Sequence, residues 1–191
     1  MKLKSFYTIC FSIIVYCSYS QTETLGLVTK KAMVVSAHPL ASKVGVDILK
    51  KGGNAIDAAV AVQFALAVVY PIAGNIGGGG FLVYRDKKGN STSLDYRETA
   101  PGKSFEKMYQ NDSGEVIEDL SFSGILAVGV PGTVRGMEEA HKKFGKLKWA
   151  ELIQPAIDLA KNGFPVTNQQ AENLNEFRLD FVKYSFRTAF V

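Results

Sequence analysis

Cysteine is almost absent from this 191-residue chain, because its only two, Cys10 and Cys17, both fall within the first twenty residues. Disulfides, thiolate nucleophiles and cysteine-based zinc sites are therefore excluded from the remainder. Histidine is equally scarce. His38 and His141 stand far apart, and neither has a cluster of carboxylates nearby in ligand spacing. The sequence accordingly predicts no metal site and no cofactor.

A strong charge of one sign is missing as well. The 22 basic and 18 acidic residues leave a net charge of +4, and two of the positive charges, Lys2 and Lys4, lie at the very start of the chain. The other lysines are scattered, and no basic stripe alternates with aromatic residues as a nucleic-acid groove would require. We expect no nucleic-acid partner.

The first twenty residues have the pattern of a secretory signal. Lys2 and Lys4 provide a positive start, and residues 9–16 form a short, largely apolar run. Ser18-Tyr19-Ser20 then provides the small-x-small pattern that signal peptidase prefers, with cleavage before Gln21.

The apolar run is shorter than the about 20 residues that a membrane-spanning helix needs. We therefore expect a signal peptide over residues 1–20, a periplasmic or secreted protein, and one domain fragment over residues 21–191. A lipoprotein signal ending at Cys17 is the alternative, and the bulky Tyr16 disfavours it.

Two helices are expected early in the domain, after a short strand over residues 33–37. Pro39 opens the first helical pattern, and Gly52-Gly53 closes it. Asn54 can cap the second helix, over residues 55–69, which is apolar on nearly every face. Such a helix belongs in a protein interior, most simply against a sheet.

A β-hairpin is expected next, with strands over residues 81–85 and 91–96 joined by a polar, glycine-bearing turn. The pattern of helices around a hairpin predicts an α+β fold in which helices cover an antiparallel sheet. The later expected elements are a strand over 125–130 and helices over 133–144, 149–162 and 168–184.

Seven residues from Gly74 to Gly80 include five glycines, and such loops can bind phosphate. A dinucleotide-binding loop follows a strand and opens a helix, whereas this one follows a helix and enters a strand at Phe81. A Walker-type loop would also have a lysine and a hydroxyl residue after its last glycine. The run is predicted instead to permit close backbone packing and a sharp turn.

The segment Asp95-Tyr96-Arg97-Glu98-Thr99-Ala100-Pro101 is the strongest candidate for a functional site. On a continuous strand Asp95 and Arg97 share a face, so their side chains could simply form an ion pair. Alternatively, Arg97 could present its planar guanidinium to a substrate carboxylate. The residues alone leave both interpretations open.

Five blocks of sequence, in their order along the chain, resemble the start of the large subunit of the γ-glutamyltransferases, also called glutathione hydrolases. The similarity extends over about residues 31 to 170. The blocks are residues 32–42, 52–61, 74–81, 97–101 and 130–134.

This resemblance implies an N-terminal-nucleophile hydrolase, an αββα sandwich that is incomplete in this chain. In that family a proenzyme cleaves itself, and the threonine freed at the start of the small subunit attacks the γ-glutamyl amide of glutathione or a related compound. Water, or the amine of an amino acid or peptide, then takes the acyl group from the threonine ester. The matching block implies that Arg97 holds the α-carboxylate of the glutamyl group.

The chain departs from the family pattern in its extent. It stops at Val191, and the block that begins with paired threonines is absent, so we expect no catalytic residue in this chain and no activity from it alone. Thr99 and Thr133 are not terminal, and Thr133 is expected to cap a helix. His38 is expected to be structural. The alternatives are a sibling acylase of cephalosporin or poly-γ-glutamate type, or a truncated homologue that only binds γ-glutamyl compounds.

Overall fold

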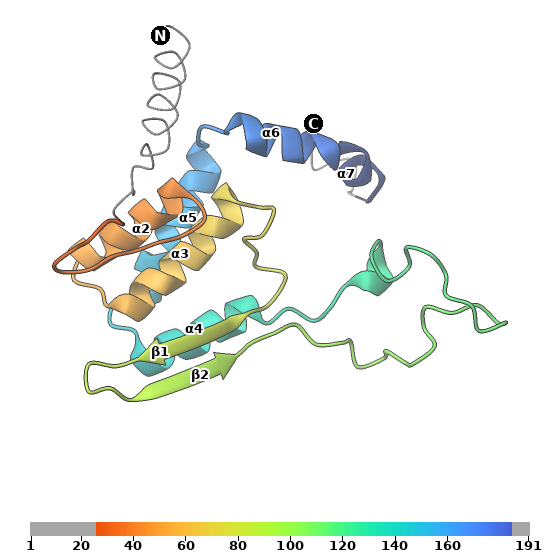
Figure 1. Cartoon of the computed structure of the whole chain (residues 1–191), viewed down its shortest axis with the longest axis horizontal. Coiled ribbons are helices and arrows are strands. Elements are labelled where there is room, and N and C mark those ends of the chain that lie inside the picture. Colours follow the sequence, from red (N-terminus) through yellow and green to blue (C-terminus); the bar gives the residue numbers. More distant parts are fainter. Residues whose placement is uncertain (1–25, 185–191) are drawn as a thin grey trace, which may run out of the picture. The chain divides into compact units, whose positions relative to one another are not determined.

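The computed structural model describes residues 26–184, so the expected signal peptide and both cysteines lie outside the described residues. The chain divides into two compact units, residues 1–33 and 34–191. The described part of the first unit, residues 26–33, contains no helix or strand. The described elements of the second unit (Figure 1) are α2 (Pro39–Lys50), α3 (Ala55–Val69), β1 (Phe81–Arg85), β2 (Ser91–Asp95), the 3-10 helix η1 (Ile125–Ala127), α4 (Thr133–Phe144), α5 (Trp149–Asn162), α6 (Asn168–Glu176) and α7 (Arg178–Tyr184).

Helix α2 begins where the sequence predicts it. His38 is its N-cap, and the imidazole Nδ1 accepts a hydrogen bond of 3.2 Å from the backbone N–H of Leu40. The first turn of a helix has backbone N–H groups without partners inside the helix. Pro39 has no N–H, and this side-chain bond satisfies the N–H of the next residue. The strand expected over residues 33–37 is wrong, since these residues form no backbone ladder with any described strand.

Helix α3 is started by a capping box, which its sequence predicts. The Asn54 side chain accepts hydrogen bonds from the backbone N–H groups of Ile56 and Asp57, at 2.9 and 3.0 Å. In return, Oδ2 of Asp57 accepts from the backbone N–H of Asn54 at 2.9 Å. Two of the otherwise unpaired donors at the helix start are thereby satisfied reciprocally.

The core is centred on α3, which packs against α2 and α5 (Figure 1). Fully buried side chains from all three helices meet there, including Ile48, Val60 and Leu152, and each contributes about 1.5–3 kcal/mol by leaving water. Side chains of the hairpin, Leu82 and Leu94 among them, are partly buried against the same cluster. The expectation that α3 packs mainly on a sheet is therefore only partly right, because its principal neighbours are helices.

Asp57 also connects α3 to the loop between α4 and α5. Its carboxylate is fully buried and accepts hydrogen bonds from the backbone N–H groups of Lys146, at 2.9 Å, and Leu147, at 3.3 Å. The Asn54 amide donates to the carbonyl of Phe144 at 2.6 Å. The residues that cap α3 thus satisfy the backbone where α4 ends.

The hairpin forms as predicted. β1 and β2 pair antiparallel, with Phe81 opposite Asp95 and Arg85 opposite Ser91. Its turn is stabilised by the Asp86 carboxylate, which accepts from the backbone N–H groups of residues 88 and 90. The α+β class predicted from the element pattern is therefore confirmed for the described chain.

Two later elements differ from expectation. Residues 125–130 do not form a strand: η1 occupies Ile125–Ala127, and only Val130 pairs, in an isolated bridge with Thr99. No neighbouring strand among the described residues offers a partner for the rest of the segment. Residues 168–184 are helical as expected, but the helix is interrupted at Phe177, which caps the C-terminus of α6.

Gly136 brings α4 against the end of β2. A Cβ atom at this position would lie less than 3.0 Å from the ring of Tyr96, closer than real Cβ contacts come. Burial of the Tyr96 ring raises the pKa of its phenol above the ordinary value. The absence of a side chain at Gly136 therefore allows the helix to approach the residue next to Arg97.

Gly136→Ala is expected to lower the free energy of unfolding by about 1–3 kcal/mol, because overpacking against Tyr96 outweighs the better helix propensity of alanine. Urea unfolding of the chain measures this difference. Gly102→Ala is the matched control, since a Cβ at Gly102 meets nothing within 4 Å. A Gly136→Ala variant more stable than the parent chain would contradict the contact.

Candidate functional site

The glycine run lies alongside the segment that contains Arg97. Backbone hydrogen bonds join Gly80 and Tyr96 in both directions, at 3.4 and 3.0 Å, and continue the pairing of the hairpin by one residue. At Gly79, a Cβ would collide with the backbone of Arg97 and Glu98. The predicted role of the run in close backbone packing is thus confirmed.

The other side of the glycine run holds the start of α4. The carbonyl of Gly78 accepts hydrogen bonds from the backbone N–H groups of Gly132 and Thr133, at 2.8 and 3.0 Å. In a phosphate-binding loop such donors would face the anion, but here both donate to the carbonyl of Gly78. The run therefore links the start of α4 to the segment after β2.

Thr133 is not the helix cap that its sequence position suggests. The N-cap of α4 is Gly132, and the buried Thr133 hydroxyl donates instead to Oδ1 of Asn75 at 2.7 Å. The same oxygen accepts from the backbone N–H of Gly78 at 2.9 Å. Asn75 is a residue that sequence reasoning missed, because its partner Thr133 lies 58 positions away.

Arg97 follows directly on the strand extension, with its side chain 60% exposed. Its guanidinium Nη2 lies 3.3 Å from a carboxylate oxygen of Glu98, and its guanidinium carbon lies 5.9 Å from the ring centroid of Phe81. Of the two interpretations that the sequence left open, the ion pair between Arg97 and Asp95 does not form. The Asp95 carboxylate accepts a hydrogen bond of 3.0 Å from the backbone N–H of Arg97 instead.

The Arg97 guanidinium has one ionised carboxylate beside it. The pKa of Glu98 is lowered, chiefly by a hydrogen bond from its own backbone N–H and then by the Arg97 guanidinium. This neighbouring ion pair is exposed, and exposed pairs are weak. The planar guanidinium has the geometry to form two parallel hydrogen bonds with a carboxylate, in exchange for this weak pair.

No described residue pairs a nucleophile with a base near Arg97. Thr99 takes part in the backbone bridge to Val130, and the Thr133 hydroxyl is committed to Asn75. Over residues 26–184 there is also no group of three or more histidine, cysteine or acidic side chains placed to hold a metal ion. The arrangement can bind an anion, and it supplies no bond-breaking group.

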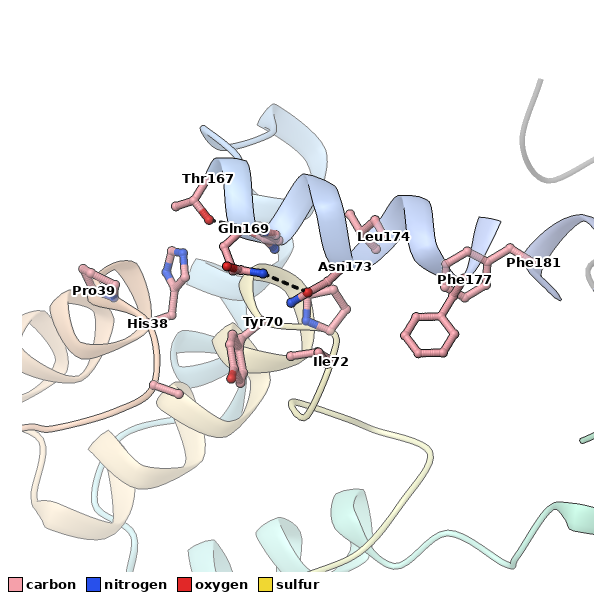
Figure 2. Close-up of a pocket in the computed structure, with 13 residues that line it drawn as sticks. His38, Pro39, Tyr70, Ile72, Thr167, Gln169, Asn173, Leu174, Phe177 and Phe181 are labelled. Atoms are coloured by element: carbon pink, nitrogen blue, oxygen red, sulfur yellow. Dashed lines mark hydrogen bonds between the residues drawn. The ribbon is translucent and has the colours of Figure 1, made fainter. Parts of the chain in front are cut away.

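A separate cavity of about 550 Å³ lies between the start of α2, the turn after α3, and helices α6 and α7 (Figure 2). His38 lines it beside Tyr70 and Ile72, and Leu174 and Phe177 close the other side. Arg97 does not line this cavity. The imidazole of His38 caps α2, as described, which is the structural role expected of it.

Phe81 is a neighbour of Arg97 that sequence reasoning missed. The hairpin register contains the signal for this contact. Phe81 lies opposite Asp95, and a residue in that position is the diagonal neighbour of Arg97, two positions after Asp95.

None of the helices in the described range is long and apolar enough to cross a membrane.

Most of the chain is similar in sequence to known proteins. A sequence profile described as Gamma-glutamyltranspeptidase matches residues 41–191. A glutathione hydrolase proenzyme from Pseudomonas sp. (strain A14) is 53% identical over 154 residues, which cover 81% of this chain and 27% of that protein. The chain thus spans about a quarter of the length of this curated relative.

Solved structures give a consistent result. The crystal structure of Helicobacter pylori gamma-glutamyltranspeptidase matches with a TM-score of 0.81 at 53% identity, over 83% of this chain and 46% of that one. The cephalosporin acylase from Bacillus halodurans matches with a TM-score of 0.68 at 27% identity, over 86% of this chain and 32% of that one. The backbone arrangement is common to both, and the sequence similarity is much greater to the first.

Proposed function

The chain belongs to the gamma-glutamyltranspeptidase family, and from this membership we propose that the complete protein hydrolyses glutathione and transfers its γ-glutamyl group to amino acid or peptide acceptors. Its fold class is that of the N-terminal-nucleophile hydrolases, to which its structural neighbours belong. The described residues contribute helices and one antiparallel hairpin to that fold.

The observation that carries the proposal is the family match over residues 41–191, which includes Arg97 at an exposed position after β2. We assign the α-carboxylate of the γ-glutamyl substrate to this guanidinium. The cephalosporin-type acylase hypothesis has less support, since identity to the Bacillus halodurans cephalosporin acylase is 27% against 53% to the Helicobacter pylori enzyme.

The proposed reaction begins when a threonine hydroxyl oxygen attacks the γ-carbonyl carbon, with a neighbouring amine taking its proton. The amide C–N bond breaks, the leaving amine is protonated, and a γ-glutamyl-threonine ester remains. Water or an acceptor amine then cleaves the ester and restores the threonine. In this proposal the threonine corresponds to a part of the relatives' sequence that this chain does not cover. It lies at the start of a small subunit released by self-cleavage.

Arg97 has a binding role in this scheme and takes no part in proton transfer. Arginine stays charged at any working pH, so it cannot serve as the base. Its position on a strand end held by backbone hydrogen bonds suits a residue that must present a fixed anion site.

The proposal also covers processing and location. Residues 1–20 act as a signal peptide, residues 21–191 belong to the large-subunit domain, and the mature enzyme is periplasmic or secreted. Mass spectrometry of the large subunit, purified from cells that express the complete gene, is expected to show that it starts at Gln21, as the free residue or as pyroglutamate. Lipid attached at Cys17 would support the lipoprotein alternative instead.

The activity is tested by expressing the complete reading frame that contains residues 1–191 and following amine release from a γ-glutamyl anilide. We expect cleavage into two subunits, seen on a denaturing gel, and turnover that increases when an acceptor dipeptide is added. A full-length product that never cleaves would contradict the enzyme proposal and favour an inactive homologue. Cleavage with turnover of a cephalosporin substrate alone would favour the acylase.

A further inference from the structure

Besides Glu98, two side chains at paired positions of the hairpin contact Arg97. Asp95 is the last residue of β2, and Phe81, the first residue of β1, lies directly opposite it. One contacts the Arg97 backbone and the other faces its guanidinium. The two contacts therefore act on different parts of the same residue.

Asp95 controls the direction of the chain where β2 ends. Its Oδ1 atom accepts from the backbone N–H two residues on, at 3.0 Å, which is the hydrogen bond of an Asx turn. Gly79 also lies so close to the Arg97 Cα that a Cβ at Gly79 would collide with it. Two contacts thus restrict the Arg97 backbone before its side chain is considered.

Phe81 acts on the guanidinium. Its ring centroid lies 5.9 Å from the guanidinium carbon, within the range of a cation–π interaction. Phe81 is 63% exposed and does not belong to the hydrophobic cluster that the hairpin packs against. An arginine side chain has many rotamers, and a flat partner on one side reduces the number that a bound carboxylate must select from.

We propose that Asp95 and Phe81 are positioning residues for the substrate carboxylate, Asp95 by aiming the Arg97 backbone and Phe81 by orienting its guanidinium. This inference rests on the proposed function, because it requires Arg97 to bind the γ-glutamyl α-carboxylate. Neither residue touches the reacting amide in this scheme. Both are expected to influence KM and to leave kcat nearly unchanged.

Steady-state kinetics of the complete, self-cleaved enzyme on a γ-glutamyl anilide tests the Asp95 contact. Asp95→Ala is expected to raise KM about tenfold, since it removes a hydrogen bond from an ionised acceptor. Asp95→Asn keeps an oxygen for the same N–H and is expected to recover most of that loss. Equal losses in both variants would show that charge, not the turn, matters, and would overturn the proposal for Asp95.

The Phe81 contact is tested in the same assay. Phe81→Leu is expected to raise KM about two- to fivefold, the size of an exposed cation–π contact, and Phe81→Tyr to restore it. Ser93→Ala, at an exposed position of β2 away from Arg97, serves as the control for strand substitutions. A KM for Phe81→Leu equal to that of the parent enzyme would remove Phe81 from the proposal.

A double-mutant cycle separates positioning from general structural damage. If Asp95 acts through Arg97, adding Asp95→Ala to Arg97→Ala lowers kcat/KM little further. An undiminished additional loss would mean that Asp95 supports the fold rather than the anion site. Parent enzyme that cleaves itself but does not turn over the anilide would refute the proposed function, whereas active parent enzyme with unchanged Asp95 and Phe81 variants would refute only this inference.

Discussion

Replacing Arg97 by alanine in the complete enzyme is expected to weaken substrate binding by about 2 to 5 kcal/mol, provided that the lost carboxylate pair is desolvated when substrate is bound. The expected result is a large rise in KM for a γ-glutamyl anilide with self-cleavage intact. The reason is that the alanine leaves the substrate carboxylate without its bidentate partner, while the hydrogen bonds of the surrounding backbone do not depend on the guanidinium.

Two further variants sharpen this test. Arg97→Lys keeps the positive charge but loses the planar fork, so its KM is expected to lie between those of the parent enzyme and the alanine variant. Arg85→Ala removes an exposed arginine at the other end of the hairpin and is expected to leave KM unchanged. Parent-like affinity in Arg97→Ala would refute the carboxylate site.

Replacing Asp57 by alanine is expected to destabilise the chain by about 3 kcal/mol or more. The substitution removes the buried acceptor of the backbone N–H groups of Asn54, Lys146 and Leu147, whose hydrogen bonds are partly buried, and a buried donor left unsatisfied costs about 1–3 kcal/mol. Urea unfolding followed by circular dichroism measures the loss. The effect should exceed that of any single surface substitution in α2 or α3.

The appropriate control for Asp57 is Asp47→Ala. Asp47 is an exposed aspartate of α2 whose partner is Lys43 one turn earlier, and a surface pair of this kind contributes little. Asp57→Asn keeps one acceptor oxygen but directs an NH₂ group at a donor, so we expect an intermediate loss. Equal stability of the Asp47 and Asp57 alanine variants would mean that the carboxylate does not hold the α4–α5 loop.

Much of the site could be predicted from sequence because its framework is local. The Asn54 capping box and the Asp86 turn depend on residues three and four positions apart, and the two strands of the hairpin pair across that short turn. The exposed position of Arg97 after β2 follows from the same local pattern. The partner of Arg97 does not, because strand alternation predicts that Asp95 faces the guanidinium, whereas the Asx turn uses the Asp95 carboxylate on the backbone.

The sequence by itself determined where helices and turns begin, the α+β class, and the family to which Arg97 owes its proposed role. Tertiary structure alone decided that residues 33–37 and most of residues 125–130 are not strands, because a strand exists only where another backbone offers it hydrogen bonds. It likewise decided the buried partners of Asp57 and Thr133. Those partners lie many residues away along the chain, and only the packing of α3, α4 and the glycine run brings their atoms within bonding distance.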